Sequence, residues 1–210
     1  CIAISLLPAA ALADTAATSG TCGENSGDNV VWALDDNGTL TISGEGRMKD
    51  FGTVYSTHPW ENFDKEIKSV VVKEGVQSIG DYAFYNCVNL KSVTLPSGLK
   101  FIGDSAFKGT AIESIVFPDS LYSIGDSAFS VTPIKNIDFP SALNNIGSWA
   151  FEKCLGLTSV VIPDSVEKVY DYAFYGCKNL KSATIGKKVD QIYDCTFSDC
   201  TSLETVNLPD

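Results

Sequence analysis

The chain has 210 residues, of which 44% are hydrophobic and 20% are charged, so it carries enough apolar material for a sizeable core and no compositional sign of disorder. Its formal net charge at pH 7 is −11, and an acidic surface repels phosphate backbones and anionic lipids. Nucleic-acid binding and direct membrane binding are therefore disfavoured as functions.

Residues 1–13 have the character of a secretory signal peptide. The stretch is apolar from Ile2 onward and ends in the sequence ALA, which fits an A-x-A-like cleavage site. It is too short to span a bilayer. A basic leading region is missing and the only methionine is Met48, so we expect the signal to be truncated at its start. A buried or membrane-retained segment is the alternative.

Residues 14–28 and 29–66 differ from each other and from the rest of the chain. The first segment is small and polar, which is typical of a linker. The second contains two alternating runs around Asp36-Asn37-Gly38, which is a strong β-hairpin signal. We expect residues 29–66 to form an N-terminal cap with a β-hairpin that covers the exposed end of a repeat array.

Residues 67–210 repeat one unit. The phenylalanines of the repeats recur at steps of 23, 22, 22, 23 and 23 residues: Phe84, Phe107, Phe129, Phe151, Phe174 and Phe197. Six full repeats run through residues 68–203, and a seventh begins at Glu204. A unit of this length cannot bury its apolar face alone, so the period predicts a solenoid of stacked coils.

Each unit divides into parts with different expected structures. Residues 90–96, LKSVTLP, alternate in polarity as a half-buried strand does, and the proline ends the strand. A second short extended piece follows, then a glycine turn. The stretch DSAFKGT fits one helical or 3₁₀ turn whose alanine and phenylalanine face inward. Seven parallel strands in one sheet are therefore predicted.

The cysteines occupy one small, buried position of the repeat. Cys87, Cys154, Cys177 and Cys200 share a column in which two other units have Thr110 and Thr132. Free buried thiols are expected, with a disulfide between neighbouring coils as the alternative. The chain has no CxxC spacing and a single histidine, so we expect no metal site.

A second column is acidic, and two interpretations compete for it. Its members are Asp81, Asp104, Asp126, Ser148, Asp171 and Asp194. Stacked carboxylates are able to bind calcium between coils, whereas Asp and Ser also cap the short turn behind them. Because serine keeps a cap but loses a ligand, the cap is the preferred interpretation.

The sequence carries no recognisable catalytic signature. There is no G-x-S-x-G motif and no glycine-rich phosphate loop, and His58 stands alone beside Pro59 and Trp60. Carboxylate pairs for glycoside chemistry remain open, because acidic residues are plentiful. We expect no enzyme activity and no cofactor.

The outward positions of the strands are the candidate ligand-binding residues. Inward positions hardly vary, whereas the outward ones mix charge, hydroxyl groups and exposed valine, as a shallow binding surface does. A solvated face without a ligand is the alternative. The candidates are Lys91, Thr94, Glu113, Val116, Lys135, Asp138, Thr158, Val161, Lys181 and Thr184.

The repeat unit resembles the BspA-type leucine-rich repeat. The unit LKSVTLPSGLKFIGDSAFKGTAI follows that pattern, and the resemblance covers residues 68–210. It implies a right-handed solenoid of α/β type with short parallel strands and short helical or 3₁₀ turns, exported to the bacterial cell surface. It also implies adhesion to host proteins or to other bacteria, without a defined ligand or any catalytic residue.

These observations support a secreted or cell-surface module that recognises a host or bacterial surface protein or glycan through a concave sheet face. A structural spacer, or an accessory domain that displays a downstream domain such as a wall-active enzyme, is the alternative. The oligomeric state stays open.

Overall fold

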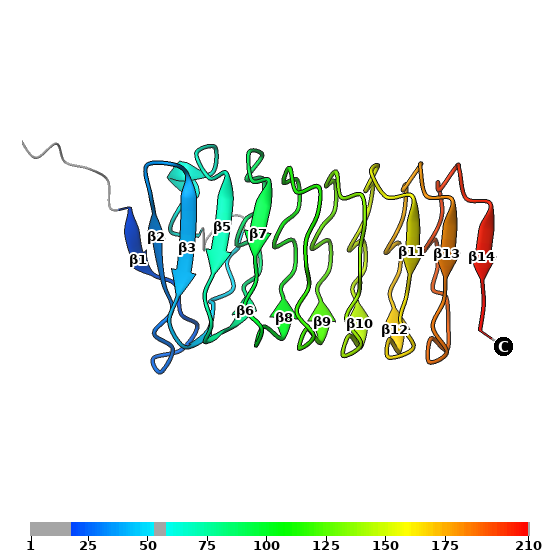
Figure 1. Cartoon of the computed structure of the whole chain (residues 1–210), viewed down its shortest axis with the longest axis horizontal. Coiled ribbons are helices and arrows are strands. Elements are labelled where there is room, and N and C mark those ends of the chain that lie inside the picture. Colours follow the sequence, from blue (N-terminus) through cyan, green and yellow to red (C-terminus); the bar gives the residue numbers. More distant parts are fainter. Residues whose placement is uncertain (1–17, 53–57, 210) are drawn as a thin grey trace, which may run out of the picture.

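The computed structural model describes residues 18–52 and 58–209, which form one elongated stack of coils (Figure 1). The predicted signal peptide, residues 1–13, lies outside the described residues. In the view of Figure 1 the coils follow one another along a nearly straight line, with strands on two sides.

The coils carry short strands on two sides of the stack, and these strands form three sheets. The first side contains β5 (Ser69–Val72), β7 (Ser92–Thr94), β11 (Ser159–Val161), β13 (Ser182–Thr184) and β14 (Thr205–Asn207). The second side contains β6 (Val76–Ile79), β8 (Phe101–Ile102), β9 (Ser123–Ile124), β10 (Asn145–Ile146) and β12 (Lys168–Val169). Strands of neighbouring coils pair in parallel, as Val70 with Val93 and Ile79 with Ile102 show. The fold is therefore a β-solenoid, as the repeat predicted.

The predicted hairpin is present at the amino end of the stack. β2 (Val31–Leu34) pairs antiparallel with β3 (Thr39–Ser43), and Asp35 Oδ1 shapes the turn by accepting from the amide of Thr39 at 2.8 Å. β3 then pairs in parallel with β5, and β4 (Gly46–Arg47) pairs in parallel with β6. Residues 39–47 thus do not only cover the first repeat. They continue the strand pairing on both sides of the stack by one coil.

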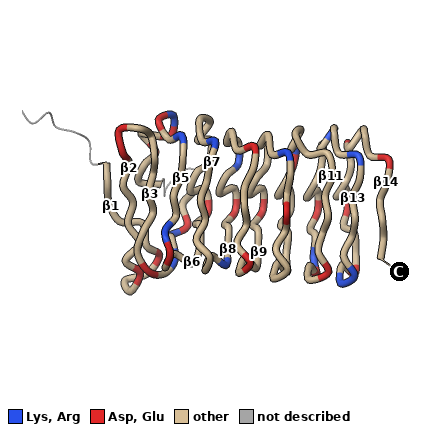
Figure 2. The backbone as a smooth tube through the Cα atoms, in the orientation of Figure 1, with Lys and Arg blue, Asp and Glu red and all other residues tan. Residues whose placement is uncertain are grey.

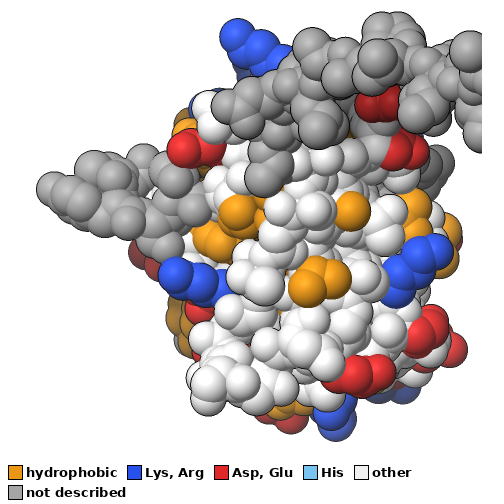
Figure 3. Space-filling model, turned by 90° about the vertical axis from the view of Figure 1, so that its left-hand side faces the viewer, with side chains coloured by type: hydrophobic (Ala, Val, Ile, Leu, Met, Phe, Trp, Pro, Cys, Tyr) orange, Lys and Arg blue, Asp and Glu red, His pale blue; other side chains and the backbone are white. Residues whose placement is uncertain are grey.

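The linker prediction for residues 14–28 was wrong at its centre. Ser19–Thr21 forms β1, which pairs antiparallel with β2, with Gly20 opposite Trp32. A strand that pairs through backbone groups alone needs no apolar pattern, so the sequence carried no signal for it. Seen from this end, the stack shows mostly backbone and polar atoms with isolated hydrophobic patches (Figure 3).

A row of stacked aromatic rings runs through the core. The phenylalanines of the six repeats stack on one another with ring centroids 5.2–5.5 Å apart, and five of them are fully buried. Trp60 begins the row by stacking on Phe84 at 5.6 Å, and its indole Nε1 donates to the carbonyl of Ala83 at 2.8 Å. Trp60 thus takes the place of a repeat phenylalanine ahead of the first repeat.

The predicted helical or 3₁₀ turns of the repeats were wrong. Among the described residues the only helix is η1 (Glu61–Phe63), which precedes the repeats. Tyr82 and Asn86 have positive φ angles of 55° and 57°, which interrupt a helix. Alternate amides of residues 82–87 bond to the next coil, as Phe84 N does to Ala106 O at 2.8 Å, and the amides between them close single turns, as Tyr85 N does with Tyr82 O at 3.2 Å. This turn segment therefore adds a third row of hydrogen bonds between coils.

The acidic column also acts between coils, so the cap prediction was wrong. Asp81 Oδ1 accepts from the amide of Asp104, Asp104 Oδ1 from that of Asp126, and Asp126 Oδ1 from that of Ser148, each at 2.7 Å. Asp50 Oδ1 of the preceding coil accepts in the same way from the amide of Asp81, at 3.1 Å. We call this row the aspartate ladder. Each carboxylate holds the following coil, not its own turn.

The cysteines of the repeat column are free and buried, as predicted. Cys154, Cys177 and Cys200 each donate to a phenylalanine carbonyl of the preceding coil at 3.1–3.3 Å. Thr132 fills the same slot and donates to the carbonyl of Phe129 at 2.8 Å. Burial raises the pKa of the Cys22 thiol, outside this column, to about 12, which keeps that thiol protonated and unreactive.

The aromatic row should dominate the stability of the stack. The Phe129→Ala substitution removes a fully buried ring that stacks on a neighbour on each side. We therefore expect the free energy of unfolding to fall by about 3–5 kcal/mol. Urea denaturation followed by circular dichroism measures it. Phe101→Ala, at a half-buried position of β8, is the control and should cost clearly less. Equal losses would contradict a central role for the row.

The negative charge of Asp104 should lower the stability of the fold at neutral pH, although its oxygen accepts a hydrogen bond from the next coil. Burial, together with neighbouring carboxylates, raises the pKa of Asp104, so the folded state binds its proton more tightly than the unfolded state does. The stability that this proton supplies is present at low pH and is lost as pH rises through the raised pKa. Asp104→Asn keeps the acceptor oxygen without the charge and should stabilise the protein at pH 7.

The measurement is the melting temperature of both proteins between pH 7 and about pH 4, the ordinary range of carboxyl titration. The advantage of Asp104→Asn should shrink as pH falls. Asp119→Asn, an exposed aspartate outside the ladder, should show no such trend. A constant advantage at every pH would rule out the charge as its cause.

Candidate functional site

The candidate site, here called the strand face, is the outward surface of the strands on the first side of the stack together with the coil segments 113–118 and 135–140. Of the ten residues predicted for it, nine are exposed and Thr184 is half-buried. Two valines stand out, because Val116 is 84% exposed and Val161 is 59% exposed. Val161 lies directly beside Thr184 in the register of β11 and β13. The structure thus places the predicted residues on one surface.

The charged residues of the strand face do not form a uniform basic stripe. Lys135 and Glu113 make an exposed ion pair, and Lys135 lowers the pKa of the Glu113 carboxyl through this hydrogen bond. Among the described residues, Lys91 and Lys181 form no ion pair. Figure 2 shows charges of both signs collected at the turns that precede these strands. A partner therefore meets charges of both signs along this edge.

The strand face is interrupted twice, which the prediction of seven continuous strands missed. Ser114 and Asn136 form only an isolated parallel bridge, and in the described chain no strand pairing joins this bridge to β7 or to β11. β11, β13 and β14 form a separate three-stranded sheet. The face therefore consists of three pieces with a break on either side of the middle piece.

The breaks coincide with two coils that are one residue shorter. Five positions separate Phe107 from Ile112, whereas six separate Phe84 from Leu90. The turn segments of these coils keep their pairing, as the bond from Phe107 N to Ala128 O at 2.8 Å shows. The missing residue must then be absorbed on the strand side, where strand pairing with β7 and β11 is interrupted.

Larger side chains accompany the shorter coils. Phe117 and Phe139 stand where other coils have Leu95, Ile162 and Ile185. The two rings stack with centroids 6.2 Å apart, which is wider than the usual strand spacing of about 4.8 Å. Two phenylalanines therefore fill part of the space that the disrupted pairing leaves.

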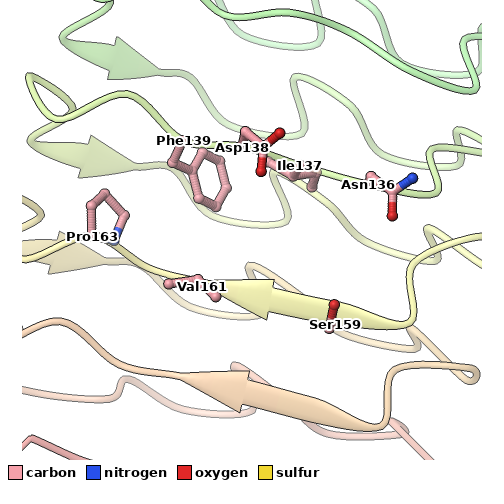
Figure 4. Close-up of a pocket in the computed structure, with 7 residues that line it drawn as sticks. All are labelled: Asn136, Ile137, Asp138, Phe139, Ser159, Val161 and Pro163. Atoms are coloured by element: carbon pink, nitrogen blue, oxygen red, sulfur yellow. The ribbon is translucent and has the colours of Figure 1, made fainter.

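A shallow pocket lies at the second break (Figure 4). Its volume is about 380 Å³, and one wall is the run from Asn136 to Phe139 while the other is formed by Ser159, Val161 and Pro163. The view shows the two walls on neighbouring coils, with the ring of Phe139 near Pro163. Amide, carboxylate and hydroxyl groups thus border an apolar floor.

A second pocket lies at the first break. It has a volume of about 280 Å³ and is lined by Val93, Thr94, Leu95, Val116 and Pro118. Its lining is less polar than that of the pocket at Phe139, with Thr94 as the one hydroxyl. Each break in the sheet therefore opens a pocket on the strand face.

Sequence reasoning found some of the pocket residues and missed others. Thr94, Val116, Asp138 and Val161 were among the predicted site residues. Phe139 and Pro163 were missed, because the expected continuous sheet has no depressions. The change in repeat step from 23 to 22 residues was the available signal.

The arrangement suits recognition by contact. In the part of the chain that the structure describes, no group of three or more histidine, cysteine or acidic residues is placed to hold a metal ion. No helix within these same residues is long and apolar enough to cross a bilayer. Small pockets with mixed polar and apolar walls on an extended surface are typical of binding sites.

Comparisons with known proteins agree with the repeat structure. A leucine-rich repeat protein from Eubacterium ventriosum matches with 32% identity and a TM-score of 0.72, over 81% of this chain and 45% of that protein. A leucine-rich repeat protein from Bacteroides ovatus matches with 28% identity and a TM-score of 0.68, over 86% and 52%. The chain thus spans about half the length of these two proteins. No curated protein matches the sequence.

The repeats also match a described family. The BspA type leucine rich repeat region matches residues 61–181 and 168–210, with six copies. These ranges cover the repeat array and η1 ahead of it. The chain therefore belongs to the family of BspA-type leucine-rich repeat proteins.

Proposed function

We propose that this chain is an exported binding module of a bacterial surface protein, which recognises a protein or glycan on a host or bacterial surface through the strand face. The observation that carries the proposal is the pocket between Phe139 and Val161. It combines an exposed apolar side chain with the hydroxyl of Ser159 and the carboxylate of Asp138. Such a combination provides contact area together with hydrogen-bonding specificity.

The arrangement of the face supports an extended ligand. Both pockets lie on the same side of the stack, separated by the coil segment that contains the bridge from Ser114 to Asn136. The ion pair of Glu113 and Lys135 lies at the start of the same coil segments. A partner that covers both pockets contacts polar and apolar groups side by side, and non-obligate interfaces are likewise of mixed polarity.

The proposed location rests on the amino end and on the family. The apolar stretch of residues 1–13 has the pattern of an export signal, and BspA-type repeats are associated with bacterial surfaces. The net charge of −11 argues against a nucleic-acid partner. We assign the chain a role in binding, not in catalysis.

Reversing the charge of Lys91, Lys135 and Lys181 together should weaken the binding of a ligand to the strand face. All three are exposed, so folding should be unchanged while affinity falls by about tenfold through lost electrostatic complementarity. The measurement is binding to a glycan array and to a panel of extracellular-matrix proteins. The control reverses Lys49, Lys100 and Lys168, which are exposed on the second side of the stack and give the same net charge.

Equal losses in both triple variants would show a nonspecific charge effect. Silence of the folded protein on both panels would favour the alternative role as a spacer or accessory domain.

Blocking the pocket at Phe139 should lower the affinity for a ligand even when the charges at the strand starts are unchanged. Val161→Arg places a long side chain over the pocket, and we expect at least about a tenfold loss of affinity for any hit from the panels. Val88→Arg, at a 52% exposed valine outside the strand face, is the matched control. Unchanged affinity in Val161→Arg would place the ligand elsewhere.

A further inference from the structure

A third pocket lies away from the strand face, where the segment ahead of the repeats meets the first turn segment. Its volume is about 250 Å³. From the first segment it is lined by His58, Glu61 and Asp64, and from the turn segment by Tyr82, Tyr85 and Asn86. It shares no lining residue with the two pockets of the strand face.

The walls of this pocket are held in place by the core. Trp60 anchors the first segment, because its buried ring stacks on Phe84 and its Nε1 donates to Ala83. The amide of Glu61 donates to the carbonyl of His58 at 3.1 Å, which fixes the start of η1. The pocket is therefore built against a buried aromatic anchor.

The acidic side of the pocket is organised by His58. This side chain is buried, at 8% exposure, and its Nε2 lies 2.8 Å from Asp64 Oδ1. The buried thiol of Cys87 lies 3.6 Å from the same oxygen. Both contacts use Oδ1, and among the described residues no hydrogen bond reaches Oδ2. The carboxylate of Glu61 is exposed beside it.

The opposite side of the pocket is aromatic. The rings of Tyr82 and Tyr85 meet edge to face, with centroids 5.7 Å apart and planes at 65°, so they form a corner. Both side chains are half-buried, which leaves part of each ring accessible. Aromatic faces attract cations through the ring quadrupole, and carboxylates attract them through charge.

We propose that this pocket binds a basic side chain, lysine or arginine, of a protein partner. Two carboxylates and two tyrosine rings converge on one small volume, and in the described part of the chain neither Glu61 nor Asp64 pairs with a lysine or arginine of the protein itself. A cation placed there contacts aromatic faces and carboxylate oxygens at once. An anion or a phosphate is excluded by the same charges.

The test uses the whole chain and defined small probes. Nα-acetyl-lysine methylamide and Nα-acetyl-arginine methylamide are titrated while the amide signals of residues 58–64 and 82–87 are followed by NMR. Nα-acetyl-norleucine methylamide supplies a similar chain without charge, and N-acetylglucosamine tests a sugar at the tyrosines. We expect saturable shifts with at least one of the cationic probes alone.

Two variants and two matched controls locate the site. Glu61→Gln and Tyr82→Ser should each lower the affinity for the cationic probe by about two- to fivefold. Serine stands at the position of Tyr82 in two other coils, as Ser105 and Ser127, so the fold accepts it. Tyr172→Ser, in the same column outside the pocket, and Glu66→Gln should leave the affinity unchanged.

Several results would overturn the proposal. They are the absence of saturable shifts with both cationic probes, an equal response to the norleucine probe, a response to the sugar alone, or full affinity in Glu61→Gln. Glu61 is exposed, so this variant cannot fail through loss of folding. None of these results depends on whether the strand face binds a ligand.

Discussion

The structure depends on the contact between each coil and the next. A coil of 22 or 23 residues has too little interior to fold by itself, so its apolar face, its backbone amides and its polar side chains must be satisfied by its neighbours. Stacked phenylalanines, turn-segment hydrogen bonds and the aspartate ladder all connect one coil to the next. Interactions that ordinarily serve within one element, such as an aspartate beside a turn, are used here between coils.

This regularity explains why two shorter coils leave pockets on only one side. The aromatic row and the turn segment continue without interruption through Phe107 and Phe129, so these coils cannot slide relative to their neighbours. The missing residue is then taken from the strand side, where pairing stops and Phe117 and Phe139 occupy part of the space. The candidate site is thus a local departure from a repeat whose other rows stay intact.

The segment ahead of the repeats takes the place of a preceding coil and also forms a pocket of its own. Through β3, β4, Asp50 and Trp60 it offers the first repeat the same kinds of contact that a preceding coil would offer. Its other residues are not copies of the repeat, so it introduces chemistry that the later coils lack. His58 is the only histidine of the chain, and it lies in the pocket that this junction creates. The two kinds of pocket therefore arise from different irregularities of one stack.

The sequence by itself determined the number of coils, the buried columns and the side on which the candidate residues lie, because period and polarity report burial directly. The ten candidates were placed on a single face for this reason. Only the tertiary structure decided the roles that depend on spacing between coils. The sequence could not show that Asp104 accepts from the next coil, nor that Val131 adopts a φ of 59° in place of a helical turn. It also could not show that a shorter coil opens a pocket at Phe139, because the side that absorbs the missing residue is chosen by which intercoil contacts are stronger.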